Sequence, residues 1–256
     1  MNDPQEFAGR VALVTGGSRG IGRATACQLA SGGARVAINY AHDDAAANGT
    51  LACLAGEGHM VIKADIADPY EVQRMINTVA SEMSGLDILI NNAGSFEVDH
   101  ILKVSYEEWL ATWDRTLAIN LRSAANASFC AVPHMRKRGG GRIVNVSSRG
   151  AFRGDPDYLG YVAGKAAMKA MAQSMAIALA PEKIAVATVA PGWVDTDMAA
   201  PFLAGDSVEA ANAQSPLNRI ARPEEIAHAI VFLASQQAEF ATGCVIDVNG
   251  ASYLRP

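Results

Sequence analysis

RVALVTGGSRGIG, residues 10–22, decides the fold of this chain. Its first part, Arg10–Thr15, is apolar and rich in valine, as a strand buried on both faces should be. The glycines that follow permit a tight turn and let the backbone approach a pyrophosphate at the positive end of the next helix. Strand, glycine turn and helix in this order predict a dinucleotide-binding site.

Short apolar runs alternate with helix-like segments along the rest of the chain. The predicted strands are Arg10–Thr15, Arg35–Asn39, Met60–Ala64, Asp87–Asn91, Arg142–Ser147, Ile184–Ala190 and Cys244–Val248. The predicted helices are Ile21–Ser31, Asp44–Ala55, Tyr70–Met83, Tyr106–Arg136, Tyr158–Leu179 and Pro223–Ala234. This alternation predicts an α/β fold, a Rossmann-type doubly wound parallel sheet of seven strands with helices on both faces.

We see no linker or internal repeat, so residues 1–256 are predicted to form a single domain. The cofactor motifs fall mainly in 10–95, and the catalytic and substrate elements in 115–220.

Composition argues against several classes of protein. The net charge of −5 disfavours a nucleic-acid surface, which needs a basic field. No apolar run reaches the ~18 residues that span a membrane, and the first residues lack the pattern of a signal peptide. Four cysteines and five histidines are scattered without metal-ligand spacing. We therefore expect a cytoplasmic protein with reduced cysteines and no metal, membrane or nucleic-acid partner.

Tyr161 precedes Lys165 by four residues, about one helical turn, so a helix holds the phenol and the ammonium on one face. A nearby cation favours the phenolate, so we expect Lys165 to lower the pKa of Tyr161 from its usual ~10 towards a value useful for proton transfer. Ser148 is suited to hydrogen-bond the oxygen that exchanges this proton. Taken singly, Ser148 and Asn120 are better explained by capping or turn formation.

The spacing Thr15-Gly16-x-x-x-Gly20-x-Gly22 resembles that of the short-chain dehydrogenase/reductase family, and further family motifs follow in the same order. They are Asn91-Asn92-Ala93-Gly94, Asn120, Ser148 thirteen residues before Tyr161, Pro191–Thr196 and Val245–Gly250. The resemblance implies hydride transfer between a nicotinamide and a carbonyl or secondary alcohol. Its implied catalytic residues are Asn120, Ser148, Tyr161 and Lys165, with Tyr161 as the acid/base.

The resemblance also implies a cofactor-binding set. It comprises Gly16, Ser18, Arg19, Gly20, Ile21, Gly22, Asn39, Tyr40, His42, Asp65, Ile66, Asn92, Ala93, Gly94, Tyr161, Lys165, Pro191, Gly192, Val194 and Thr196. NAD-preferring members carry an aspartate where Tyr40 stands, whereas Arg19 suits a 2′-phosphate. We therefore expect NADP(H) to be preferred, with NAD(H) possible. Asp43 and Asp44 oppose this preference if they face the site, although they also suit the start of a helix.

The substrate is a small carbonyl or alcohol whose identity the sequence leaves open. The chain looks most like the 3-oxoacyl-acyl-carrier-protein reductases, but Glu182 stands where those commonly place an arginine. Binding of an acyl carrier protein is therefore doubtful, despite a basic cluster at residues 136–138. Sugar and steroid-type alcohol dehydrogenases fit as well. A non-enzymatic dinucleotide sensor is the rival class, disfavoured because all four catalytic residues are retained.

Family members hold substrates with the loops after Gly94 and Ser148 and with the segment after Thr196. Here residues 197–203 look like a mobile lid, and Arg149 and Arg153 suit either an anionic substrate or solvated loop charges. Tyr158 has no cation four residues on and is predicted to be a pocket wall. Small residues along 166–174 suit close helix contact, and relatives form homotetramers.

Overall fold

Seven parallel strands form the sheet that the sequence predicts. The computed structural model describes residues 5–203 and 206–255. The strands are β1 (Val11–Val14), β2 (Arg35–Tyr40), β3 (Met60–Lys63), β4 (Ile88–Asn91), β5 (Gly141–Val146), β6 (Ile184–Pro191) and β7 (Val245–Val248), ordered β3-β2-β1-β4-β5-β6-β7. Val14 is in register with Ile38 on one side and Ile90 on the other. All three are fully or almost fully buried, because helices cover both faces.

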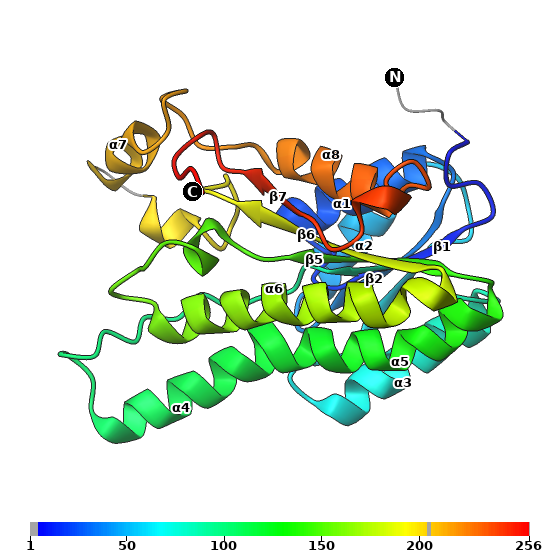
Figure 1. Ribbon diagram of the computed structural model, residues 1–256, viewed down its shortest axis with the longest axis horizontal. Helices are drawn as coiled ribbons and strands as arrows, with labels where there is room; N and C mark the ends of the chain where they lie inside the picture. The colour runs from blue at the N-terminus through cyan, green and yellow to red at the C-terminus, as the bar shows by residue number, and fades with distance from the viewer. Residues whose placement is uncertain (1–4, 204–205, 256) are drawn as a thin grey trace.

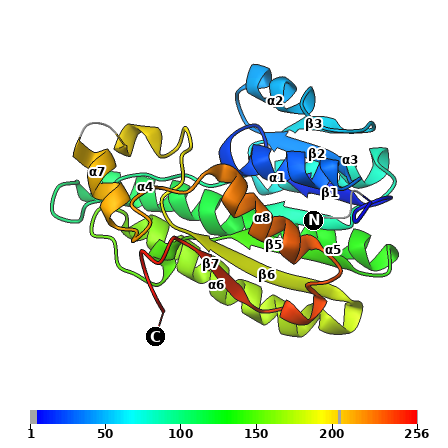
Figure 2. The same cartoon turned by 90° about the horizontal axis from the view of Figure 1, so that it is seen from above.

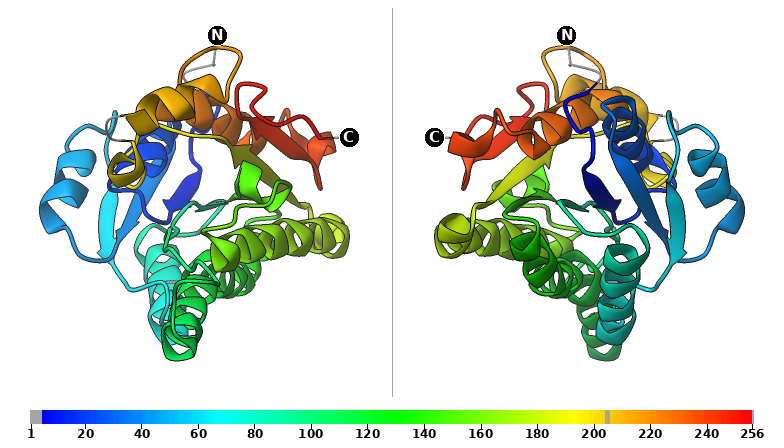
Figure 3. Two further views of the ribbon diagram at one scale, coloured as in Figure 1. Left: turned by 90° about the vertical axis from the view of Figure 1, so that its left-hand side faces the viewer. Right: turned by 90° about the vertical axis from the view of Figure 1, so that its right-hand side faces the viewer.

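Helices cover both faces of the sheet (Figures 1 and 3). On one face α1 (Gly20–Ser31) packs against α8 (Pro223–Ala234), as Figure 2 shows from above. The other face carries α3 (Pro69–Glu82), α4 (Tyr106–Leu117), α5 (Ser123–Lys137) and α6 (Leu159–Leu179). A short helix, α2 (Asp44–Leu51), lies at the edge beside β2 and β3. Local signals start these helices: a Ser105–Glu108 capping box begins α4, and an Asp68 cap followed by Pro69 begins α3.

The stretch predicted to be helical, Tyr106–Arg136, is helical throughout, but it contains a π-helical turn that the sequence pattern did not reveal. A π-helical turn, η1 (Ala118–Arg122), separates α4 from α5. Two side chains bond to backbone carbonyls there: Asn120 Nδ2 donates to Thr116 O at 3.1 Å, and the Ser123 hydroxyl donates to Ile119 O. Such turns carry an extra residue and are frequent at functional sites. A π turn is still helical, so the sequence pattern did not distinguish it from the α-helices on either side.

A helix that we did not predict, α7 (Asp206–Ala213), lies beyond the segment that follows Thr196. It stands at the carboxyl end of the sheet, together with the loops after β4, β5 and β6 (Figure 1). Ligands of open α/β sheets bind at this end.

Candidate active site

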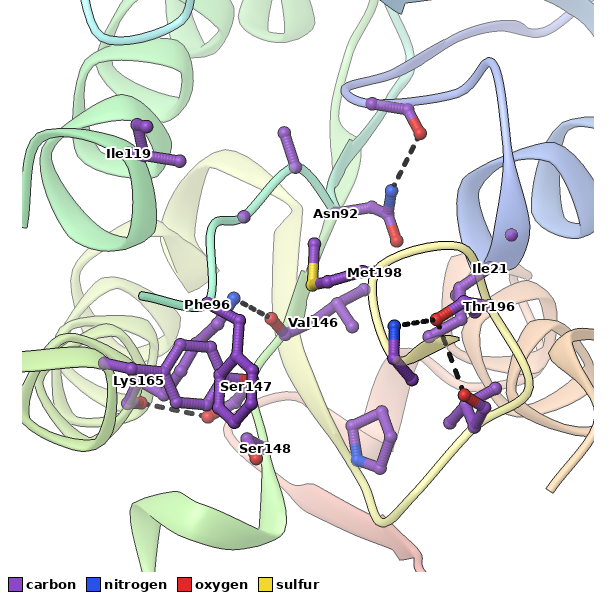
Figure 4. A pocket seen from close by; sticks show the side chains of 18 of the residues that line it. Ile21, Asn92, Phe96, Ile119, Val146, Ser147, Ser148, Lys165, Thr196 and Met198 are labelled. Atoms are coloured by element: carbon purple, nitrogen blue, oxygen red, sulfur yellow. Dashed lines mark hydrogen bonds between the residues drawn. The ribbon is translucent and has the colours of Figure 1, made fainter. Parts of the chain in front are cut away.

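A cavity of about 510 Å³ opens at the carboxyl end of the strands (Figure 4). Most of the residues predicted from sequence line it: Gly16, Arg19, Gly20, Ile21, Asn39, Tyr40, His42, Asp65, Ile66, Asn92, Ala93, Gly94, Ser148, Tyr161, Lys165, Pro191, Gly192, Val194 and Thr196. Three predicted residues do not line it, namely Ser18, Gly22 and Asn120. The structure thus brings residues from six loops to one surface.

The glycine loop between β1 and α1 is built for close approach of a ligand. Gly16 has φ +61°, and Gly20 has φ +50°, in the left-handed region that favours glycine. Gly22 lies behind the cavity, where a Cβ would stand 2.2 Å from Gly16 O. The first turn of α1 has no acidic residue and no side-chain cap. An uncapped helix start of this kind suits an anion, so the loop fits the pyrophosphate of a dinucleotide.

Two asparagines fix the shape of this loop. Asn92 Nδ2 donates to Thr15 O at 2.9 Å and Gly16 O at 3.1 Å, which ties the end of β4 to the turn. Asn39, which belongs to the predicted cofactor-binding set, lines the cavity, and its buried amide also hydrogen-bonds within the protein. Its Oδ1 accepts from Gly16 N at 3.3 Å, and its Nδ2 donates to Ala64 O at 3.1 Å. Asn39 therefore supports the loop.

Arg19 lies between two carboxylates at the cavity rim. It forms an ion pair with Asp43, and its Nε is 3.5 Å from Asp197 Oδ2. Asp43 also caps α2 by accepting from Ala46 N at 2.8 Å. The prediction that Asp43 is a cap is therefore confirmed, and Asp43 also contacts Arg19, a residue that lines the cavity. Asp44 instead pairs with Lys63 at 3.2 Å, away from Arg19.

Helix α6 carries Tyr161 and Lys165, and a buried carboxylate holds its first residues. Asp99, in the loop after β4, is 1 % exposed. Its two oxygens accept from Leu159 N and Gly160 N, each at 2.6 Å. Sequence reasoning missed Asp99 because its partners are sixty residues away and no local pattern marks it. This contact sets the start of α6 immediately before Tyr161.

Ser148, Tyr161 and Lys165 meet at the floor of the cavity. Burial raises the pKa of Tyr161, while a hydrogen bond with Ser148 acts in the opposite direction. Lys165 is 3 % exposed, its Nζ donates to Val146 O at 2.9 Å, and burial lowers its pKa to about 8. The prediction that Lys165 lowers the pKa of Tyr161 is wrong for this arrangement, in which desolvation dominates.

Asn120 lies one layer behind these residues, in η1. It is fully buried, and its Nδ2 donates to Ser95 O at 2.9 Å. A Cβ on Gly94 would stand 2.9 Å from Asn120 Oδ1 and 3.4 Å from Lys165 Nζ, so both groups face the Gly94 backbone. Gly164, whose Cβ would stand 3.2 Å from that of Asn120, lets α6 approach the turn closely.

Aromatic rings cover the floor residues on the solvent side. The Phe96 ring stacks on Tyr158 with centroids 3.8 Å apart and meets Tyr161 edge-on at 4.8 Å. Phe202, from the segment after Thr196, meets Phe96 at 5.1 Å. In the view of Figure 4, the Phe96 ring overlaps the side chain of Lys165. Phe96 and Trp193 line the cavity, whereas Tyr158, predicted to be a wall, lies behind Phe96.

Known proteins resemble this chain along nearly its whole length. A family model described as enoyl-(acyl carrier protein) reductase matches residues 16–251. A 3-oxoacyl-[acyl-carrier-protein] reductase of Staphylococcus aureus is 38% identical over 245 residues, 95% of this chain and 98% of that protein. This chain belongs to the short-chain dehydrogenase/reductase family.

Two further members of the family are similar along nearly the whole chain. A cis-4-hydroxycyclohexanecarboxylate dehydrogenase of Sinomonas cyclohexanicum is 38% identical, covering 96% of this chain and 97% of that protein. A Serratia marcescens short-chain dehydrogenase/reductase with two phenylalanine-to-leucine substitutions superposes with a TM-score of 0.88 at 35% identity, covering 96% and 99%. As a short-chain dehydrogenase/reductase, the chain is an oxidoreductase acting on CH–OH or C=O groups.

Within the described residues of this short-chain dehydrogenase/reductase, no helix is long and apolar enough to cross a membrane. The same residues contain no cluster of three or more side chains suited to hold a metal ion.

Proposed function

We propose that this short-chain dehydrogenase/reductase interconverts a carbonyl and a secondary alcohol with NADP(H), using Tyr161 as acid/base. The observation that carries the proposal is the meeting of Ser148, Tyr161 and Lys165 in the same cavity as the uncapped start of α1. The glycine loop, Asn92 and the Pro191–Thr196 segment hold the cofactor. When bound, the nicotinamide supplies or accepts the hydride.

Each floor residue has a role that its surroundings support. Ser148 and Tyr161 donate hydrogen bonds to the substrate oxygen, and in reduction Tyr161 gives it a proton. The raised pKa of Tyr161 keeps the phenol protonated, as a proton donor must be. Lys165 donates a hydrogen bond to Val146 O, which keeps its ammonium group near Tyr161. The ammonium group of Lys165 and the side-chain oxygen of Asn120 both face Gly94. Positioned donors at the developing alkoxide supply most of the rate enhancement.

The preference for NADP(H) rests on Arg19, the cation at the cavity rim beside Tyr40 and His42. To bind a 2′-phosphate, Arg19 must give up its ion pair with Asp43 and pair with the phosphate instead. The Asp43 carboxylate then remains nearby and repels the phosphate, because both groups are negatively charged. We therefore propose a preference for NADP(H) that Asp43 weakens. Titration of the protein with NADPH and NADH tests it, and tighter binding of NADH would contradict it.

A 3-oxoacyl thioester reductase is the second candidate, supported by the Staphylococcus aureus relative. The structure gives little support for docking of an acidic carrier protein. Arg136 pairs with Glu182 at 2.7 Å, and Arg138 pairs with Asp87 at 3.2 Å. The Sinomonas cyclohexanicum relative acts, by its name, on a hydroxy acid, and this class is the alternative. A cofactor sensor without turnover is the remaining candidate.

We further propose that this single-domain protein is cytoplasmic, as its composition suggests, and that it forms a homotetramer, as the family resemblance implies. Phe129 on α5 and Ile177 on α6 are 80% and 81% exposed, which supports association through these helices. Light scattering tests this state, and a monomer would contradict it.

The deciding experiment follows NADPH oxidation with a panel of 3-oxoacyl thioesters, cyclic ketones and keto acids, for the wild-type protein and Tyr161→Phe. We expect at least ~10³-fold loss of kcat in the variant because the proton donor is absent, with NADPH affinity retained. Substantial turnover by Tyr161→Phe would contradict the role of Tyr161. Binding of NADPH with turnover of no substrate would favour the sensor.

A further inference from the structure

Two arginines beside Ser148 have no part in the proton and hydride chemistry. Arg149 and Arg153 both line the cavity, on the loop that joins β5 to α6. Arg149 Nη2 donates to Gln214 Oε1 at 2.8 Å, and Arg153 Nη1 approaches the same oxygen at 3.4 Å. Two cations thus share one neutral acceptor, which follows α7.

Neither arginine forms an ion pair with any carboxylate that the structure describes. Asp155 interacts with Arg149 electrostatically, without a hydrogen bond or an ion pair between them. This is unusual in a chain with a net charge of −5, where most other pocket and surface arginines, such as Arg19 and Arg219, have carboxylate partners. The pair therefore presents positive charge to the cavity.

Hydrogen-bond donors remain unused at the same wall. Arg149 Nη1 and Trp193 Nε1 are buried and have no partner within the described part of the chain. Both residues line the main cavity and also a second cavity of about 130 Å³. A buried N–H without an acceptor costs roughly 1–3 kcal/mol, more for a charged group. Burial and the neighbouring Arg153 also lower the pKa of Arg149. An anion placed here relieves both penalties.

The anion must lie close to the reacting carbon. Ser148 and Arg149 are consecutive, and both line the same cavity as Tyr161, so a small substrate bound in this cavity can contact all three residues. The phosphate of an acyl carrier or coenzyme thioester lies at the far end of the pantetheine arm, beyond this reach. A carboxylate on a small substrate satisfies the distance, and its two oxygens match the guanidinium fork.

We propose that the substrate carries a carboxylate a few bonds from the reacting carbon, held by Arg149 with help from Arg153 and Trp193. The substrates are then keto acids and hydroxy acids, a statement that rests on the proposed oxidoreductase function. The alternative is that Arg149 only anchors the end of α7 through Gln214, in which case substrate charge has no influence.

The test compares each keto acid with its neutral ester. The pairs are 4-oxopentanoate with its methyl ester and 4-oxocyclohexanecarboxylate with its methyl ester. We expect wild-type kcat/KM to favour the acid by about 10- to 100-fold, the usual value of a charge-assisted contact. In Arg149→Gln the acid-to-ester ratio should fall towards one, while Arg149→Lys should retain part of it.

Arg74→Gln, the same substitution at an exposed position on α3, is the matched control and should leave the ratio unchanged. If the wild-type protein reduces acid and ester equally and Tyr161→Phe abolishes both, the carboxylate proposal is overturned and the proposed function stands. If no ketone is reduced, a binding measurement tests the carboxylate proposal instead. We expect cyclohexanecarboxylate to quench Trp193 fluorescence at a lower concentration than the neutral cyclohexanecarboxamide does. Equal affinities for the two, or unchanged affinity in Arg149→Lys and Arg149→Gln, would overturn the proposal.

Discussion

Replacing Asp99 by asparagine tests how the catalytic helix is held. The Asp99 carboxylate accepts two short bonds from the first N–H groups of α6 and is almost fully buried. Asparagine keeps one acceptor oxygen but turns an NH₂ group towards the second N–H, which then has no acceptor. A buried charge-assisted bond is worth roughly 1.5–3 kcal/mol, and the lost charge at a helix start adds up to about 1 kcal/mol. We therefore expect the free energy of unfolding to fall by about 3 kcal/mol.

Asp68→Asn is the matched control. Asp68 also accepts two backbone bonds at a helix start, from Tyr70 N and Glu71 N, but it is exposed to solvent. Asparagine is as good an N-cap as aspartate, so this variant should lose at most about 1 kcal/mol. The measurement is urea unfolding of both variants and the wild-type protein at one protein concentration. Equal losses at Asp99 and Asp68 would refute the reasoning.

Activity provides a second readout for Asp99. Leu159 and Gly160 directly precede Tyr161, so a loosened helix start misplaces the phenol more than the glycine loop. For Asp99→Asn we expect kcat to fall while NADPH affinity changes little.

Two further predictions concern charges in the cavity. Asp43→Asn keeps the cap on Ala46 N but removes the charge that pairs with Arg19, so the dissociation constant for NADPH should fall by about 10-fold and that for NADH should change less. Fluorescence titration measures both, with Asp44→Asn, whose partner is Lys63, as the control; equal effects of the two variants would argue against a role for Asp43. Burial lowers the pKa of Lys165 from 10.5 to about 8, so between these pH values the unfolded chain holds one more proton than the folded chain. The free energy of unfolding should therefore rise with pH by about 1.4 kcal/mol for each pH unit, or about 3 kcal/mol across this range. Unfolding from pH 7 to 10 should show this rise in the wild-type protein relative to Lys165→Met, and parallel pH curves would contradict it.

Local patterns predicted much of this protein correctly. All seven strands, their parallel arrangement and the helices on both faces follow from buried apolar runs alternating with helical segments. The glycine loop was predictable because its chemistry is encoded in neighbouring residues, where positive φ values and a helix start meet. Hydrophobic periodicity did not reveal the π turn at Asn120, because the turn is itself helical and differs from an α-helix by one extra residue.

Contacts between distant segments were beyond such patterns. The sequence by itself determined the fold and the residues Ser148, Tyr161 and Lys165, because spacing along one helix and order along the chain specify them. Only the tertiary structure decided that Asp99 caps α6, that Arg19 lies between Asp43 and Asp197, and that Arg149 shares Gln214 with Arg153. It also decided the direction of the pKa shift of Tyr161, since desolvation depends on everything packed around a group and not on its neighbours in sequence.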